Sequence, residues 1–139
     1  MASEEKIRKK IKKKLRIDNK RLKNSFKYAS EGIIKAYEGE QNLKVHTFVA
    51  ILVIVFGFFL KLSYIEWLIC LLLIGLVLMA ELFNTAIEYV VDLASPKIHP
   101  LAKSSKDIAA AGVLMISIIS AITGLMIFVP KLIDFFNKQ

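Results

Sequence analysis

The sequence has little cysteine and little proline: one Cys and three Pro among 139 residues. A single cysteine, Cys70, forms neither a disulfide within the chain nor a cluster of metal ligands. Because Cys70 stands in an apolar run, we interpret it as a small packing residue. The N-terminus is long and highly charged before the first apolar run, and no small-residue cleavage site follows that run, so we expect no signal peptide.

Common nucleotide-binding loops are also missing. The chain contains no GxxxxGK[ST] loop and no glycine-rich kinase loop, which excludes the two most common nucleotide folds. There is no internal repeat, and the lysine-rich N-terminus is the one segment of biased composition.

Acidic residues are scarce at the N-terminal end, where positive charge accumulates. Residues 1–27 contain 12 of the 20 Lys and Arg but only three acids, for a net charge of +9, and the rest of the chain sums to −1. Such a segment binds either nucleic acid or an anionic membrane. The apolar runs that follow favour the membrane, where each nearby Lys or Arg contributes about 1 kcal/mol. We therefore expect residues 1–27 to contact an anionic lipid surface, and we expect no nucleic-acid partner.

The first forty residues divide into two segments. Residues 1–20 form a basic lysine-rich arm that is either helical or disordered. From Leu22 to Tyr37, apolar residues recur at steps of three and four, with lysines off this stripe. This pattern predicts an amphipathic helix over 21–39 that lies in the membrane interface.

Three apolar segments without Asp, Glu, Lys or Arg follow: Val45–Leu60, Trp67–Ala80 and Ile108–Val129. A helix needs about 20 residues to cross a bilayer. The second segment is shorter and crosses only if its helix continues through Glu81, which the absence of Gly and Pro from 81–94 allows. We therefore predict an all-α integral membrane protein, with transmembrane helices at about 43–62, 65–94 and 106–130 in a domain of residues 40–139.

The distribution of lysine predicts the orientation of these helices. The N-terminal arm is basic, and the connection over 95–107 carries Lys97, Lys103 and Lys106. The connection between the first two spans carries only Lys61, close to Glu66. We therefore place the N-terminus and the 95–107 connection in the cytoplasm and the C-terminus outside.

Acidic residues occur where the second predicted helix leaves the membrane. At about 100° per residue, Glu81, Glu88 and Asp92 share one narrow face, and Asn84 borders it. An acid within the membrane costs at least a few kcal/mol, which makes it a functional-site candidate. Oxygen ligands suit Mg²⁺, which usually binds one or two carboxylates together with substrate phosphates. The alternative is a structural polar network between helices.

A basic cluster, Lys103, Lys106 and Asp107, begins the third predicted helix. A helix N-terminus favours anions, so this cluster is either a phosphate site or a flank that only anchors the helix. Glu40, before the first span, is either solvated or, if it meets Glu88, part of the acidic site. A cation-binding acidic site opposite a basic loop is the combination that phosphoryl transfer needs.

The run Glu81-Leu-Phe-Asn84-Thr-Ala-Ile-Glu88-Tyr-Val-Val-Asp92, followed by His99 and Lys106-Asp107, resembles the signature of the prokaryotic diacylglycerol kinase family. The resemblance covers about residues 21–129. It implies a homotrimeric helical bundle in the bacterial cell membrane, with active sites shared between neighbouring subunits. It also implies phosphorylation of a lipid alcohol by ATP and Mg²⁺ at the cytoplasmic face.

The resemblance assigns a role to each matching residue. Glu81 would be the general base on the lipid hydroxyl, and Glu40 and Glu88 would bind Mg²⁺. Lys106 would contact the γ-phosphate of ATP, and His46 would bind the lipid substrate together with Glu81. The other nucleotide-binding residues would be Arg21, Tyr28, Asn84, Asp92 and Asp107.

Two positions depart from the enterobacterial type of the family: His46 replaces an acid and Lys103 replaces a small residue. The stretch 40–46 is similar to the Gram-positive type, whose members act mainly on undecaprenol. The resemblance therefore favours undecaprenol as the substrate, with diacylglycerol as the alternative.

Two hypotheses from other classes are left open. A small ion- or proton-conducting oligomer explains the intramembrane acids but not Asn84 or the Lys106-Asp107 pair. A membrane anchor that recruits anionic partners through residues 1–27 leaves the acids unexplained.

Overall fold

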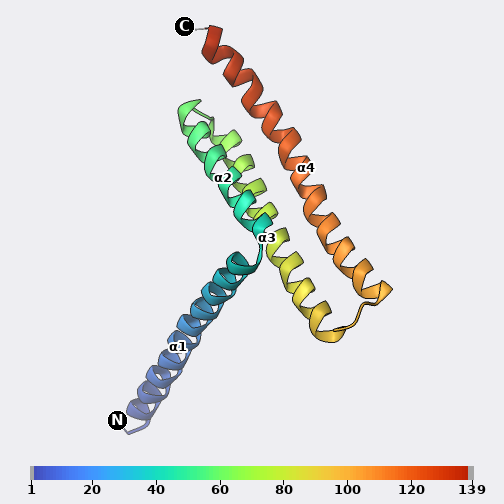
Figure 1. Ribbon diagram of the computed structural model, residues 1–139. Helices are drawn as coiled ribbons and strands as arrows, with labels where there is room; N and C mark the ends of the chain where they lie inside the picture. Colours follow the sequence, from blue (N-terminus) through green and yellow to red (C-terminus); the bar gives the residue numbers. More distant parts are fainter. Residues whose placement is uncertain (1, 138–139) are drawn as a thin grey trace. The chain divides into compact units, whose positions relative to one another are not determined.

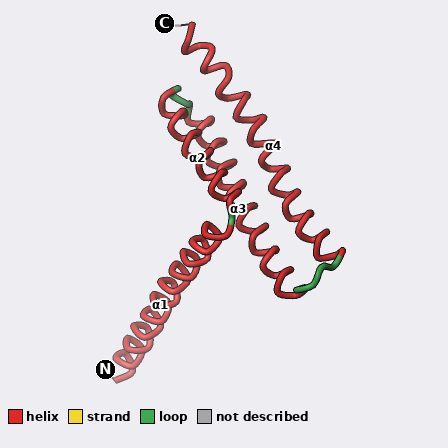
Figure 2. The backbone as a smooth tube through the Cα atoms, viewed as in Figure 1, coloured by secondary structure: helices red, strands yellow, loops and turns green. Residues whose placement is uncertain are grey.

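The computed structural model describes the backbone of residues 2–137 and the side chains of residues 18–137. These residues form four helices: α1 (Ala2–Gly39), α2 (Gln41–Phe59), α3 (Tyr64–Ala94) and α4 (Pro100–Asn137) (Figure 1). Short connections join them, and no strand occurs over residues 2–137 (Figure 2). The predicted all-α fold is therefore confirmed for this part of the chain. Residues 1–38 and 39–139 form two separate units, and each is described by itself.

The first unit is a single continuous helix. α1 is helical from Ala2 onward, so the basic arm is helical, and no break separates it from the amphipathic segment that follows. The side chains of Leu22, Phe26 and Ile33 are exposed on this helix, and Lys27 pairs with Glu31 across one turn (Nζ–Oε1 3.7 Å). An exposed apolar row beside basic residues is typical of a helix on a membrane surface. The interfacial location of residues 21–39 stays a prediction.

The second unit contains the three predicted membrane spans. α2, α3 and α4 are each long and apolar enough to cross a bilayer, which confirms the expected three spans. Within the most apolar window of each helix, only 17%, 17% and 6% of the residues are buried inside the chain. One copy of the chain therefore leaves most of its apolar surface for lipid or for neighbouring subunits to cover.

The ends of α4 differ most from the sequence prediction. α4 begins at Pro100 rather than at 106, because proline fits a first helical turn: its ring fixes φ, and the N–H that it lacks has no partner there. His99 Nδ1 accepts a hydrogen bond from the Leu101 N–H (3.2 Å), as expected for a capping residue. The predicted end at 130 is also wrong. α4 continues through Pro130 to Asn137, and Lys131 pairs with Glu66 of α3 (Nζ–Oε2 3.0 Å).

The turn between α2 and α3 is tighter than predicted. α2 ends at Phe59 rather than at 62, because Lys61 adopts a positive φ of 53°. Ser63 caps α3 by a capping box, in which its hydroxyl accepts from the Glu66 N–H while the Glu66 carboxylate accepts from the Ser63 N–H. These two bonds fix the first turn of α3.

A small apolar core lies at this end of the unit. Leu60, Leu62 and Cys70 are buried there, which confirms the packing role expected for Cys70. Trp67 packs so closely on α2 that a Cβ at Gly57 would lie 2.8 Å from its ring. Gly57 therefore allows α2 and α3 to approach each other. In the other half of α3, by contrast, the buried side chains include polar ones.

Candidate active site

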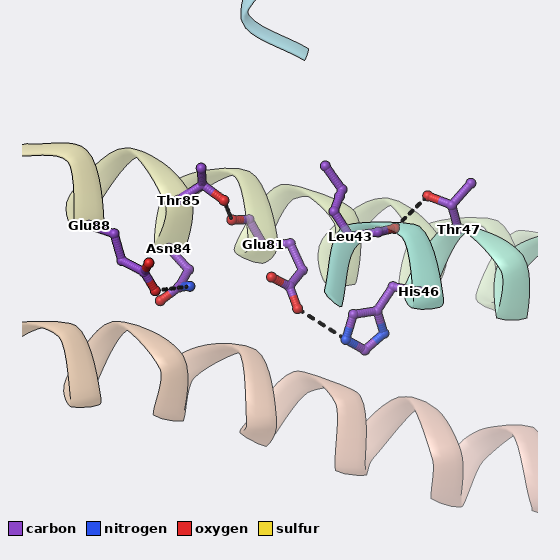
Figure 3. Close-up of polar contacts among 7 residues, drawn as sticks. All are labelled: Leu43, His46, Thr47, Glu81, Asn84, Thr85 and Glu88. Carbon is purple, nitrogen blue, oxygen red and sulfur yellow. Dashed lines mark hydrogen bonds and ion pairs between the residues drawn. The ribbon is translucent and has the colours of Figure 1, made fainter. Parts of the chain in front are cut away.

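A contact between α2 and α3 defines the candidate site. Glu81 of α3 is only 2% exposed, and its Oε1 lies 3.1 Å from Nε2 of His46 on α2. Figure 3 shows the two side chains pointing toward each other from neighbouring helices. His46 is less buried than Glu81, with 26% of its side chain exposed. The two residues that the sequence assigned to the lipid substrate therefore meet.

Polar residues also continue along the same part of α3. Thr85 is 3% exposed, and its hydroxyl donates to the backbone carbonyl of Glu81 (3.0 Å), as Figure 3 shows. This bond satisfies the hydroxyl within its own helix. Thr85 did not stand out in the sequence analysis, although it follows Glu81 by one helical turn. Leu43 of α2, also drawn in Figure 3, is 1% exposed and is thus an apolar residue buried near this site.

Asn84 and Glu88 form the next pair along α3. The Asn84 Nδ2–H donates to Glu88 Oε1 (2.9 Å; Figure 3). Asn84 is 6% exposed, and its Oδ1 is buried without a hydrogen-bond partner among the described residues. A buried polar oxygen without a partner is costly unless something else binds it. A carboxylate beside such an amide oxygen is the donor set that Mg²⁺ prefers, so these residues fit the metal that the family resemblance implies.

The described residues do not form a complete metal cage. No group of three or more His, Cys, Asp or Glu among residues 18–137 is arranged to hold a metal ion. Mg²⁺ commonly uses one or two carboxylates, and water and substrate phosphates complete its coordination. Glu88 therefore suits a Mg²⁺ ion that arrives with a nucleotide.

Glu40 lies at the junction between α1 and α2. It is the N-cap residue of α2, but its side chain makes no capping hydrogen bond, so its carboxylate is not used to close the helix. Glu40 and Glu88 are both close enough to Glu81 to interact with it electrostatically. Because like charges repel, three acids in one neighbourhood favour a bound cation.

A lysine from α4 faces this acidic group. Lys106 Nζ lies 2.6 Å from Asp92 Oδ1, and Glu88 and Glu40 also act on Lys106 electrostatically. The structure therefore brings Glu40, Glu81, Glu88, Asp92 and Lys106 into one electrostatic neighbourhood.

The expected position of Lys106 at a helix N-terminus is wrong. Because α4 begins at Pro100, Lys106 lies in its second turn, away from the free backbone N–H groups. Lys103 and Asp107 also pair with each other (Nζ–Oδ2 2.6 Å), and both side chains are exposed. Any contact of Lys106 with phosphate is therefore made by its side chain alone.

Arg21 and Tyr28 lie on α1, in the other unit, and both side chains are exposed. Their expected roles in nucleotide binding stay predictions. The face of α3 that carries Glu81 and Glu88 is thus the centre of the candidate site in the second unit.

An apolar cavity of about 560 Å³ opens beside this site and is lined by α2, α3 and α4. His46 lines it, together with apolar side chains such as Val53 and Phe128 and the two serines Ser117 and Ser120. The Ser120 hydroxyl donates to a carbonyl of its own helix (2.8 Å). The cavity was not predicted, because its lining comes from three helices and its residues are ordinary for membrane spans.

The sequence of the chain is similar to those of known proteins. Residues 27–128 match the family model described as prokaryotic diacylglycerol kinase. The chain is 48% identical over 112 residues to an undecaprenol kinase of Bacillus subtilis, an alignment that covers 81% of this chain and 91% of the relative. It is 39% identical to a diacylglycerol kinase of Synechocystis, covering 79% of this chain and 63% of the relative. It is 29% identical to a diacylglycerol kinase of Escherichia coli K12, covering 69% and 79%.

Proposed function

Because the chain belongs to the prokaryotic diacylglycerol kinase family, we propose that it transfers the γ-phosphoryl group of Mg-ATP to the hydroxyl of undecaprenol. The observation that carries this proposal is the buried Glu81 carboxylate, which contacts His46 of an apolar cavity wall and also interacts with the acids Glu40 and Glu88. A lipid alcohol and a metal–nucleotide complex need these two different surroundings on either side of one base.

The proposed chemistry assigns one role to each group. Glu81 accepts the proton of the lipid hydroxyl as the alcohol oxygen attacks the γ-phosphorus, and ADP leaves. Lys106 exchanges Asp92 for the γ-phosphate and stabilises its charge. Glu40, Glu88 and the amide oxygen of Asn84 are the oxygen ligands that would hold Mg²⁺, which would neutralise phosphate charge. Asp92 and Asp107 complete the proposed nucleotide site within the second unit. The family resemblance also assigns nucleotide binding to Arg21 and Tyr28 of α1.

The choice of undecaprenol rests on the Bacillus subtilis relative, whose name gives that substrate and whose identity to this chain exceeds that of the diacylglycerol kinases compared above. Diacylglycerol is the second candidate, because those other relatives carry that name. Family membership favours a kinase over the ion-conducting oligomer and over a simple anchor for anionic partners.

The assembly and orientation belong to the same proposal. The protein would act as a homotrimer with shared sites, which is supported by the large apolar surface that one copy leaves uncovered. Its N-terminus and active site would face the cytoplasm, where ATP is present, in a bacterial cell membrane. The +9 charge of residues 1–27 supports contact between α1 and an anionic lipid surface.

A lipid panel under one set of micelle conditions tests the proposal. Purified protein with Mg²⁺ and γ-labelled ATP is given undecaprenol, diacylglycerol or no lipid, and labelled lipid is measured. We expect transfer to undecaprenol to exceed transfer to diacylglycerol. Faster transfer to diacylglycerol would overturn the choice of lipid, and no transfer to either would overturn the kinase.

A further inference from the structure

The surroundings of Glu81 pose a physical problem for its proposed role. A general base must be ionised before it accepts a proton, but an ionised carboxylate that is 2% exposed loses most of its hydration. His46 of α2, Glu40 at the N-cap of α2 and Glu88 of α3 are the charged or titratable groups close enough to act on it. A buried carboxylate therefore needs a hydrogen-bond donor beside it to keep the ionised form that a base requires.

His46 supplies that partner. Its Nε2–H donates to Glu81 Oε1 across 3.1 Å, from a different helix. A hydrogen bond to a carboxylate stabilises its charged form and fixes the direction of its oxygens. Since Oε1 accepts from His46, Oε2 is left to accept from another donor.

The position of His46 connects this contact to the cavity. His46 lines the apolar cavity between α2, α3 and α4, whereas Glu81 is not part of the cavity wall. The imidazole therefore contacts both the cavity and the buried carboxylate, toward which Figure 3 shows it pointing.

We propose that His46 is a positioning residue, which keeps Glu81 ionised and orients its carboxylate toward the lipid hydroxyl through the Nε2–Oε1 hydrogen bond. This inference rests on the proposed function, because it concerns the base of that reaction. It assigns His46 a role through Glu81, in addition to its expected contact with the lipid.

Two substitutions separate the hydrogen bond from the bulk of the side chain. His46→Leu removes the donor, and His46→Gln keeps an N–H donor at a similar reach. Phe48→Leu is the control, because Phe48 lies on the same helix and is 60% exposed. We expect H46L to lower kcat about 10- to 100-fold, the worth of a hydrogen bond to a charged group. KM for ATP should stay within about twofold, because His46 is not among the residues proposed to bind the nucleotide. H46Q should recover most of kcat.

Infrared spectroscopy gives a readout that does not depend on activity. H46L should show a protonated-carboxyl stretch that is absent from wild type and disappears in the double variant H46L/E81Q. Wild-type kcat in H46L, no recovery in folded H46Q, or no new carboxyl stretch would each overturn the inference. An inactive wild-type protein would instead overturn the proposed function, so the two failures are distinguishable.

Discussion

Lys106 Nζ and Asp92 Oδ1 lie 2.6 Å apart, so an ion pair joins the last turns of α3 to the second turn of α4. Asp92 is the more exposed partner, with 63% of its side chain accessible against 33% for Lys106. The pair is therefore open to water, and an exposed pair of this kind contributes little to stability. The main effect of this ion pair is to hold Lys106 beside the acids of α3.

Replacing Lys106 tests whether that lysine stabilises transferred phosphate. Lys106→Met should lower kcat/KM about 100-fold or more, as the removal of one preorganised charge does in other enzymes. Lys97→Met is the control, because Lys97 is exposed in the connection before α4 and should keep wild-type kinetics. Equal kinetics in both variants would show that Lys106 only anchors its helix.

Removing the charge of Glu81 tests the general base. Glu81→Gln should lower kcat about 100- to 10,000-fold, the range expected for loss of general base catalysis. Glu66→Gln makes the same change on the same helix, but in the capping box at its other end, and should leave kcat unchanged. Both variants should elute at the wild-type position on size exclusion. Near-normal turnover by E81Q would show that Glu81 is not the general base.

The metal ligands can be tested by titration. EDTA should abolish transfer and excess Mg²⁺ should restore it. Glu40→Gln and Glu88→Gln should each raise the Mg²⁺ concentration needed for half-maximal activity at least about tenfold, since each loses a charged oxygen ligand. Glu38→Gln, an exposed acid next to the same junction, should not change that concentration. An unchanged Mg²⁺ dependence in E40Q or E88Q would exclude that residue as a ligand.

The packing of α2 on α3 predicts a difference between two glycines. Gly57→Ala should destabilise the protein by about 1–3 kcal/mol, because the new Cβ would lie 2.8 Å from the Trp67 ring. Gly75→Ala on α3 meets nothing within 4 Å in the chain and should be neutral or slightly stabilising, since alanine favours helix. Thermal unfolding in one detergent compares the two. A similar loss of stability in both variants would show that the Trp67 contact does not cause the destabilisation by Gly57→Ala.

Limited trypsin digestion tests the lipid contact of the basic arm. In vesicles that contain anionic lipid, residues 1–27 should be cleaved several times more slowly than in zwitterionic vesicles. High salt should remove this protection, because surface attraction is screened. Cleavage at the same rate in both kinds of vesicle would mean that α1 does not bind anionic lipid.

The sequence predicted the spans well because long apolar runs have few alternatives to a membrane helix. It predicted that Glu81 and Glu88 share a face because helical periodicity fixes which residues lie together. The ends of α4 were wrong, because the capping by His99 and the ion pair of Lys131 with Glu66 depend on local and tertiary contacts.

The contacts between helices could not be predicted from the sequence either. Periodicity places residues on one helix but does not say which residue of α2 faces Glu81, so the hydrogen bond to His46 required the structure. The same holds for the buried amide oxygen of Asn84 and for the cavity, which depend on the packing of neighbouring helices.

The length of α3 also fixes how far Glu81 lies from the start of that helix. From Tyr64 to Glu81 the helix rises about 25 Å at its ordinary pitch, slightly less than the hydrocarbon thickness of about 30 Å in a typical bilayer. We therefore expect the depth of Glu81 in the membrane to depend on the thickness of the bilayer as well as on the fold. A thinner bilayer moves the carboxylate toward water and a thicker one moves it into hydrocarbon, so acyl-chain length becomes a variable that tunes this catalyst without any change in its sequence.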